Sequence, residues 1–303
     1  MKTIKLGALS TSNMAMGCMR IAELSVKQVR ELIETALECG INLFDHADIY
    51  GAGQSEALFG QVLQEAPGLR EQMVIESKCG IRGGFYDFSY EHIMESTEDI
   101  LKRLHIDTLD TLLFHRPDIL AEQEEFCKAV TELKSQGKVR QFGVSNMNPA
   151  QIELLESWCG ETFVADQVQL SLMHAGIVTG GTNVNVANRE GTMYDGCLLP
   201  YCQKTQMVLQ AWSPLQYGMF QGCFIGNEKF PKLNEKLTEL ARKYGVSQTA
   251  IALAWILRIP GNMQVILGTA SPEHMRDAAM ASDVTLSRQD WYSLYSVCGY
   301  LLP

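Results

Sequence analysis

The sequence predicts an α/β protein, a single (β/α)8 TIM barrel that spans residues 1–303. Short apolar segments alternate with longer segments whose apolar residues recur at a helical period. The short segments are apolar at nearly every position, which is typical of strands buried on both faces. Because no Gly-x-Gly-x-x-Gly turn follows the first of them, an open doubly wound sheet is disfavoured, and a closed barrel is expected.

The predicted elements follow one another as strand and helix from residue 14 onward. The expected strands are residues 14–18, 42–45, 73–78, 108–115, 139–145, 165–169, 207–212 and 264–267. The expected helices lie near residues 25–39, 55–65, 89–104, 121–136, 149–158, 231–244, 247–257 and 272–281. Ser25 with Gln28 and Asn148 with Pro149 are typical helix starts, and Gly160 and Gly245 are typical helix ends.

Three segments fall outside this alternation. Residues 1–10 are expected to form a short β-hairpin at the bottom of the barrel, and an extra helix is expected at the C-terminus. Residues 172–188 are rich in Gly, Thr and Asn and are too long for an ordinary connection. We expect a loop there that shapes a pocket at the top of the barrel, with a disordered insertion as the alternative.

Composition excludes several classes of protein. A net charge of −10, from 25 Lys and Arg against 35 Asp and Glu, disfavours nucleic acid and anionic membranes as partners. There is no apolar segment of about 18 residues and no signal-peptide core, so a cytoplasmic location is expected. The nine cysteines include no Cys-x-x-Cys pair, and no His-x-His or His-Glu-x-x-His motif occurs. Disulfides and a metal site are therefore not expected.

Polar side chains end many of the predicted strands. In a TIM barrel, the carboxyl ends of the strands surround one cavity, so these side chains are expected to converge there. They are Asp45, Lys78, His115, Ser145, Asn146, Gln167, Gln169, Trp212 and Ser213, with Tyr50 in the loop after the second strand.

These groups suit the protonation of a carbonyl oxygen. An isolated tyrosine has a pKa of about 10, and the ammonium of Lys78 is expected to lower the pKa of Tyr50. Asp45 would hold Lys78 charged, and His115 would donate a hydrogen bond to the substrate oxygen. Since no side chain carries hydride, a cofactor must supply it.

The chain resembles the aldo-keto reductase family from end to end, and most closely a bacterial branch that reads FDHADIYG. The resemblance depends on FDHADIYGAGQSEALFG at 44–60, ESKCG at 76–80, LLFHRP at 112–117, KVRQFGVSN at 138–146, DQVQ at 166–169 and AWSPL at 211–215. It implies a catalytic tetrad of Asp45, Tyr50, Lys78 and His115, with Tyr50 as proton donor. His46 stands where many members of the family have Thr or Ser.

The resemblance also implies a set of nicotinamide-nucleotide contacts. Ser145, Asn146 and Gln167 would hold the carboxamide, Trp212 would stack on the nicotinamide ring, and Ser213 and Leu215 would contact the pyrophosphate. Near the 2′-phosphate, Gly268 and His274 replace the family's usual Lys and Arg, which leaves Thr269 and Arg276. NADP(H) is favoured, and NAD(H) stays open.

The sequence therefore predicts a monomeric NAD(P)H-dependent reductase of small aldehydes and ketones. Two alternatives stay open, namely a nicotinamide-redox-sensing binding module with little turnover and a Schiff-base aldolase that uses Lys78. The apolar and aromatic residues in the expected pocket loops, including Phe85, Tyr86, Tyr217 and Phe220, and Tyr300 in the C-terminal tail, suggest an uncharged substrate.

Overall fold

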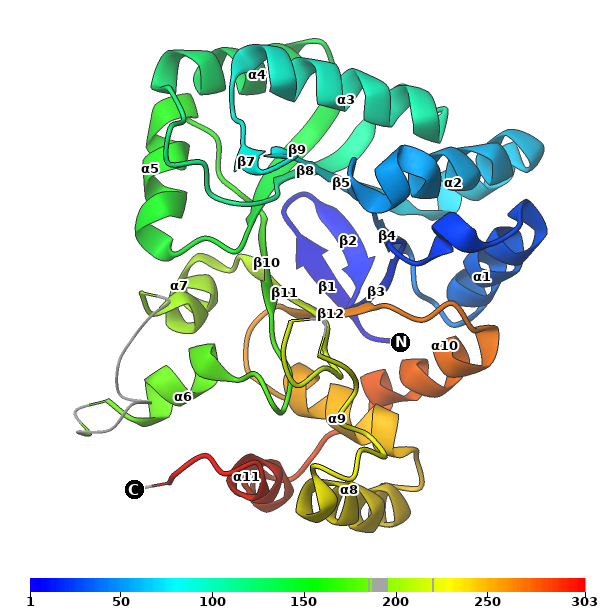
Figure 1. Cartoon of the computed structure of the whole chain (residues 1–303), viewed down its shortest axis with the longest axis vertical. Coiled ribbons are helices and arrows are strands. Elements are labelled where there is room, and N and C mark those ends of the chain that lie inside the picture. Colours follow the sequence, from blue (N-terminus) through cyan, green and yellow to red (C-terminus); the bar gives the residue numbers. More distant parts are fainter. Residues whose placement is uncertain (185, 187–195, 220, 303) are drawn as a thin grey trace.

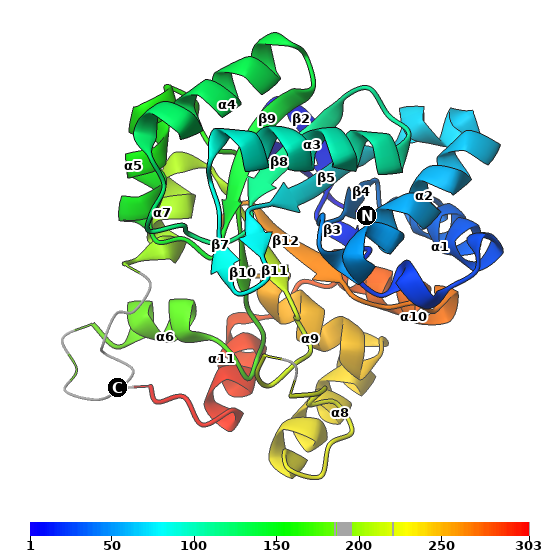
Figure 2. The same ribbon diagram turned by 45° about the horizontal axis from the view of Figure 1, so that its top comes forward.

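The computed structural model describes residues 1–184, 186, 196–219 and 221–302. At its centre, eight parallel strands close into a barrel (Figures 1 and 2). Around the barrel they are β3 (Met14–Gly17), β4 (Leu43–Asp45), β5 (Val74–Cys79), β8 (Leu109–Phe114), β9 (Val139–Ser145), β10 (Ala165–Gln169), β11 (Val208–Trp212) and β12 (Met263–Leu267), which pairs with β3. Each lies within one residue of its predicted bounds, so the predicted TIM barrel is confirmed.

Helices surround the barrel. Those that follow successive strands are α1 (Val26–Glu38), α2 (Gln54–Glu65), α3 (Tyr90–Leu104), α4 (Gln123–Ser135), α5 (Pro149–Cys159), α7 (Leu198–Thr205), α8 (Pro231–Tyr244), α9 (Gln248–Leu257) and α10 (Pro272–Ala279). Helix α11 (Arg288–Val297) is the extra C-terminal helix. Short 3-10 helices cover Ile21–Glu23, Tyr50–Gly53, Pro67–Gln72 and Met280–Asp283, and a small hairpin of β6 (Ile81–Arg82) and β7 (Phe85–Tyr86) follows β5.

The helix starts and ends arise from local sequence. Ser25 and Asn148 each form a capping box, with Gln28 and Gln151 respectively. Gly160 and Gly245 end α5 and α8 in the left-handed conformation, with φ of 70° and 69°. The residues predicted to begin and end these helices therefore do so.

The segment between β10 and β11 differs from its prediction as a long loop. Gly176–Thr182 forms helix α6, and α7 follows after residues that the structure does not describe. Residues 185, 187 and 188 of the predicted loop lie outside the described part of the chain. Glycine and threonine are weak helix formers, but the Thr182 hydroxyl bonds the Tyr295 hydroxyl of α11 at 2.6 Å. This tertiary contact helps to hold a helix that local propensity does not predict.

An N-terminal hairpin closes the bottom of the barrel. Strands β1 (Thr3–Leu6) and β2 (Leu9–Ser12) pair in antiparallel fashion, and Figure 1 shows them across the centre of the ring. Leu6 is fully buried in an apolar cluster with interior residues such as Leu113 and Val208. The side-chain amide of Gln141 donates to the Leu6 carbonyl at 3.0 Å. The predicted plug is therefore built by both packing and hydrogen bonding.

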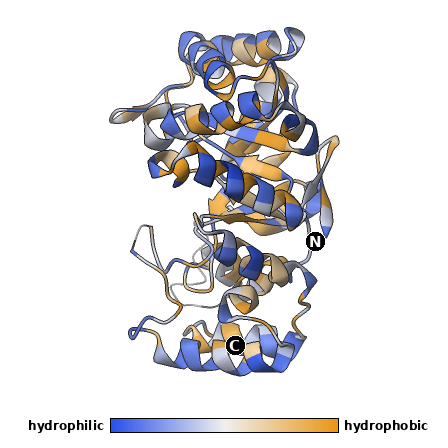
Figure 3. Cartoon of the chain, turned by 90° about the vertical axis from the view of Figure 1, so that its right-hand side faces the viewer, coloured by the Kyte–Doolittle hydropathy of each residue, from blue (hydrophilic) through white to orange (hydrophobic). Residues whose placement is uncertain are grey.

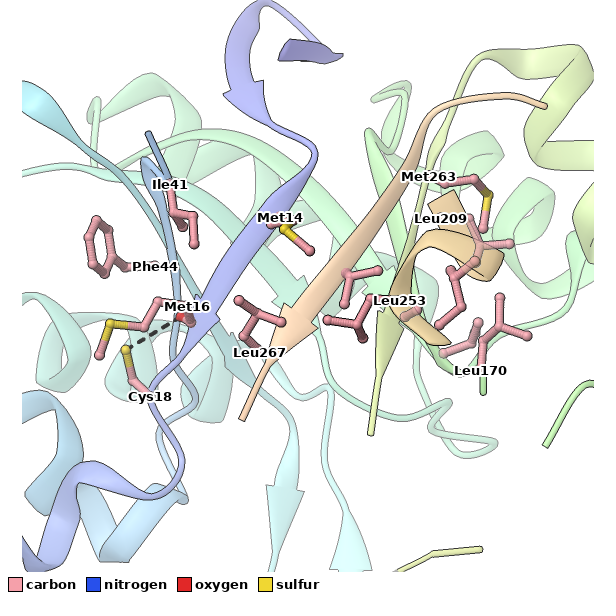
Figure 4. Packing of buried hydrophobic residues seen from close by; sticks show 14 of the residues in the cluster. Met14, Met16, Cys18, Ile41, Phe44, Leu170, Leu209, Leu253, Met263 and Leu267 are labelled. Atoms are coloured by element: carbon pink, nitrogen blue, oxygen red, sulfur yellow. Dashed lines mark hydrogen bonds between the residues drawn. The ribbon is translucent and has the colours of Figure 1, made fainter. Parts of the chain in front are cut away.

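A second apolar layer lies between the barrel and its helices. Figure 4 shows Met14, Met16, Phe44 and Leu209 among the side chains of this layer. Figure 3 shows the hydrophobic strands inside and the hydrophilic faces of the helices outside. Among the described helices, none is both long enough and apolar enough to cross a membrane.

Truncation of the plug should destabilise the barrel. Leu6→Ala leaves a cavity in the interior layer, and the free energy of unfolding should fall by about 2–5 kcal/mol in urea denaturation. Lys5→Ala, at an exposed position of the same strand, is the matched control and should have little effect. Equal stability of the two variants would contradict the plug.

Candidate active site

A buried ion pair lies at the top of the barrel. Asp45 is the last residue of β4, and Lys78 is the penultimate residue of the adjacent strand β5. Lys78 is 0% exposed, and its Nζ donates to the Asp45 carboxylate and to the His46 carbonyl, the latter at 2.7 Å. Burial alone would lower the pKa of Lys78, but attraction to Asp45, Tyr50 and Glu76 outweighs burial and raises it. Lys78 is therefore a fixed cation.

The loop after β4 brings a phenol to this cation. Lys78 Nζ donates to the Tyr50 hydroxyl at 3.3 Å. Directly after Tyr50, the backbone of Gly51, Ala52 and Gly53 is left-handed, with φ of 58°, 53° and 88°. A Cβ at Gly51 would lie 2.5 Å from the Cβ of Ala22, so the tight turn requires glycine there.

The pKa of Tyr50 departs from the sequence-based expectation. Burial of the hydroxyl raises the pKa, the nearby Lys78 ammonium lowers it, and the net value rises to about 12. Lys78 lowers the pKa of Tyr50 as expected, but the loss of hydration outweighs this effect, so the net pKa is raised. Tyr50 stays fully protonated at neutral pH.

His115 completes the cluster from the next strand. It directly follows β8, and its ring centroid lies 6.3 Å from that of Tyr50. Burial and the positive charges of Lys78 and Arg116 hold the pKa of His115 well below its usual value. The imidazole is therefore neutral, with one N–H available for donation.

Asp45, Tyr50 and His115 line one cleft of about 1110 Å³. The same cleft is lined by nearly all of the residues predicted to contact the cofactor, namely Ser145, Asn146, Gln167, Trp212, Ser213, Leu215, Gly268, Thr269 and His274. The volume exceeds the roughly 300–1,000 Å³ usual for small-molecule sites, so the cleft has room for a dinucleotide beside a substrate. Lys78 is buried and does not line the cleft.

The strand ends along this cleft have an unusual backbone. Asn146 follows β9 with φ of 59°, and Ser213 follows β11 with φ of 49°. The Trp212 indole N–H donates to Asn146 Oδ1 at 3.2 Å, and the Asn146 amide donates to the Ser145 hydroxyl at 2.7 Å. Left-handed non-glycine residues are costly and cluster at functional sites, which supports a binding role for this wall.

The comparisons with known proteins agree with this geometry. Residues 13–297 match the Aldo/keto reductase family. The chain belongs to that family. It is 36% identical over 303 residues to the 6-dehydroglucose reductase of Agrobacterium fabrum, with 95% of each chain covered. It is 35% identical to the oxidoreductase YdhF of Escherichia coli, over 96% of this chain and 95% of that protein.

Solved aldo-keto reductases have the same fold. A thermostable aldo-keto reductase, Tm1743, crystallised with the inhibitor epalrestat, has a TM-score of 0.78 and 28% identity, with 98% of this chain and 100% of that chain covered. An aldo-keto reductase from Klebsiella pneumoniae in complex with NADPH has a TM-score of 0.77 and 26% identity, over 100% of this chain and 96% of that chain.

Two predicted residues lie differently in this aldo-keto reductase. The Arg276 guanidinium bonds Thr35 Oγ1 at 3.4 Å and pairs with Glu38 at 3.3 Å, so it extends from α10 toward α1 and does not line the cleft. Gln167 lines the cleft, but its amide donates to Asp45 Oδ1 at 2.8 Å and to Gln210 Oε1 at 3.0 Å. In this structure the Gln167 amide therefore supports Asp45.

His46 packs on the outer side of the barrel strands. It is fully buried, and its ring meets that of Phe59 edge-on at 4.6 Å between centroids. Burial, together with the charge of Lys78, lowers the pKa of His46 to about 3. Its side chain is neutral, and only its backbone carbonyl contacts Lys78.

Sequence reasoning gave no role to several polar residues of the barrel interior. Glu76, Gln210 and Gln264 are 0% exposed and meet inside the barrel. Glu76 lies two residues before Lys78, and Gln210 lies two residues before Trp212. Alternate residues of a strand face the same side, so this spacing was the signal that could have found both.

Proposed function

We propose that this aldo-keto reductase reduces aldehyde and ketone carbonyls to alcohols, with a nicotinamide nucleotide as hydride source and Tyr50 as proton donor. The observation that carries the proposal is the position of Lys78 Nζ, which contacts both the Asp45 carboxylate and the Tyr50 hydroxyl at the edge of the cleft. Family membership and the NADPH complex of the Klebsiella relative support it.

The cleft residues fit such a cofactor. Trp212 offers an aromatic face, and Ser145 and Asn146 offer hydrogen-bonding groups for the carboxamide. The N-terminus of α10, capped by Ser271 beside Thr269, offers backbone N–H groups that favour a phosphate. When bound, the reduced nicotinamide supplies hydride to the carbonyl carbon.

The residues of the site then manage the proton and the developing negative charge. Tyr50 donates its proton to the carbonyl oxygen and becomes phenolate, so the substrate gains one hydride and one proton. The Lys78 ammonium stabilises that phenolate, and Asp45 keeps Lys78 charged and in place. Neutral His115 orients the carbonyl oxygen by donating its N–H.

The geometry disfavours the Schiff-base alternative. A nucleophilic lysine must be neutral and must reach the substrate. Lys78 is 0% exposed, has a raised pKa and donates to three oxygen atoms. A redox-sensing module could keep the same site, and steady-state turnover separates it from a reductase.

Loss of the phenol should abolish proton donation without loss of the binding site. Tyr50→Phe is expected to lower kcat by roughly 10²–10⁴-fold, the range typical of a general acid. The assay follows the absorbance of the reduced nicotinamide with a panel of aldehydes, and Trp212 fluorescence reports cofactor affinity, which should hardly change. Tyr86→Phe removes a hydroxyl from the same cleft and is the matched control. Equal turnover by the two variants would reject the proposed acid.

The cofactor preference is proposed to depend on Gly268. Gly268 lines the cleft, and a Cβ there would meet no atom within 4 Å, so the position has space for the first atom of a side chain. Gly268→Lys should tighten NADPH binding about tenfold and leave NADH binding unchanged, since a charge-assisted bond to the 2′-phosphate forms only with NADPH. Gly68→Lys adds the same charge at another open position. Equal tightening for both nucleotides would contradict this assignment.

We further propose that the preferred substrates are aldehydes that carry hydroxyl groups. A smaller pocket of about 350 Å³ adjoins the cleft, since both share Arg116, Asn146 and Trp212. Its lining is partly polar, with Gln169 and His174, and partly apolar, with Val168, Ile177 and Leu198. Relatives that are 36% and 32% identical are named 6-dehydroglucose reductases, and they act on a hydroxylated aldehyde as their name states.

This proposal keeps the uncharged substrate that the aromatic loops suggested and adds hydroxyl groups to it. Of the described aromatic residues on which that expectation depended, Tyr86 lines the cleft, whereas Phe85, Tyr217 and Tyr300 do not. Phe220 lies outside the described residues. The Tyr300 hydroxyl instead accepts from the Ala175 backbone N–H at 3.2 Å.

Substitution of Arg116 tests the proposed preference for hydroxylated aldehydes. Arg116→Met should raise KM for glyceraldehyde by about tenfold, the loss expected for a charged hydrogen bond, and leave KM for benzaldehyde unchanged. Arg288→Met, at an exposed residue of α11, is the control. A parallel change for both aldehydes would show that Arg116 does not recognise hydroxyl groups.

A further inference from the structure

Glu76 is a buried acid that the proposed reaction does not use. It lies on β5 two residues before Lys78, and it is 0% exposed. Its carboxyl oxygens contact Gln167 of β10 at 3.4 Å and Gln210 of β11 at 3.1 Å. Since β11 lies opposite β5 in the order of the closed barrel, Glu76 spans the interior beneath the ion pair.

A chain of amides leads from Glu76 to the plug at the bottom of the barrel. Gln264 Nε2 donates to the Ser12 carbonyl at 2.6 Å, and a backbone carbonyl can only accept. Gln264 Oε1 therefore accepts from Gln210 Nε2 at 2.9 Å, and Gln210 Oε1 accepts from Gln167 Nε2 at 3.0 Å. The Ser12 carbonyl thus orients every amide in the chain.

This fixed orientation determines what each carboxyl group can do. Asp45 Oδ1 accepts from both Lys78 Nζ and Gln167 Nε2, so Asp45 is the carboxyl group that is paired with the buried cation. Asp45 and Glu76 are paired in register on the adjacent strands β4 and β5, and their negative charges repel each other. Two neighbouring buried carboxyl groups repel each other unless one carries a proton. Asp45 has the Lys78 ammonium as its partner, whereas the hydrogen-bond partners of Glu76 are neutral amides, so Glu76 is the better carrier of the proton.

The balance of charges in the buried cluster also indicates that Glu76 is protonated. The charged and titratable groups that act on Glu76 are Asp45 of β4 and Lys78 of its own strand, and its partners from β10 and β11 are neutral amides. Thr111 of β8, paired in register with Glu76, is also uncharged. With Glu76 protonated, the buried cluster has one cation and one anion; ionisation would leave an uncompensated charge inside the barrel.

We propose that Glu76 is a positioning residue: it stays protonated inside the barrel, donates its proton to Asp45, and thereby holds the Asp45–Lys78 pair in the orientation that faces Tyr50. The inference rests on the proposed function of Tyr50 as the acid. Ionisation of Glu76 adds a negative charge behind Lys78 and makes Tyr50 a weaker acid.

The electrostatics of the group support this geometry. Burial, together with repulsion by Asp45, raises the pKa of Glu76 to about 8, although Lys78 opposes the shift. A carboxyl group with a raised pKa in the folded state stabilises the fold fully at low pH, and this contribution is lost as pH rises toward 8. Glu76 is therefore expected to ionise within the range in which the enzyme can be assayed.

The first experiment compares pH profiles of kcat/KM for wild type and Glu76→Gln with glyceraldehyde and NADPH. The variant keeps a hydrogen-bond donor but cannot ionise. At pH 6 the two should agree within about twofold, and between pH 7 and 9.5 wild type should lose about three- to tenfold more activity than the variant. Glu65→Gln, at an exposed position of α2, should follow wild type. Parallel profiles for wild type and Glu76→Gln would overturn the inference.

Two further measurements need no turnover, so they decide the inference even if the proposed reaction fails. The melting temperature of wild type, relative to Glu76→Gln, should fall by at least about 3 °C between pH 5 and 9. Because Asp166 is a second buried carboxyl group with a pKa raised to about 8, the test uses the difference between the infrared spectra of wild type and Glu76→Gln. This difference spectrum should contain the carbonyl band of a protonated carboxylic acid at pH 6, and the band should weaken as pH rises through about 8. A difference spectrum without that band at pH 6 would show that Glu76 is ionised, and the inference would be wrong.

Discussion

The contact between Lys78 and Asp45 constrains the rest of the site. An ammonium that is 0% exposed is costly unless its charge is matched and its hydrogens are bonded. Lys78 meets this condition through Asp45, the His46 carbonyl and Tyr50. These partners come from β4 and the loop after it, so the ion pair holds the proposed acid beside β5. The proposed proton transfer depends on this arrangement, and the same arrangement disfavours an amine nucleophile.

The barrel interior is organised in layers that support this pair. Leu6 and its apolar neighbours fill the bottom. Above them, Gln264, Gln210 and Gln167 pass hydrogen bonds from the Ser12 carbonyl to Asp45. A buried amide is stable only when its donors and acceptors are paired, so each layer depends on the one beneath it. A plug made by the first residues of the chain therefore orients groups at the opposite end of the barrel.

Above these layers, the residues at the edge of the cleft include several with a left-handed backbone. The left-handed residues Asn146 and Ser213 occur where β9 and β11 end, and Gly51 turns the loop directly after Tyr50. Such conformations persist only when surrounding packing stabilises them. The bonds from Trp212 to Asn146 and from Asn146 to Ser145 provide that support. The backbone at the rim of the cleft is therefore held by contacts within the protein itself.

Much of this molecule follows from the sequence alone. The strands were predictable within one residue because most of their residues are buried and because each is followed by a polar or glycine-containing turn and a segment of helical period. The convergence of Asp45, Tyr50, Lys78 and His115 was predictable because the carboxyl ends of parallel barrel strands share one face. Tertiary structure decided the pKa direction of Tyr50, the contact of Arg276 with Glu38, the helix at Gly176–Thr182 and the environment of Glu76. These depend on hydration and on partners from distant elements, which local sequence patterns do not encode.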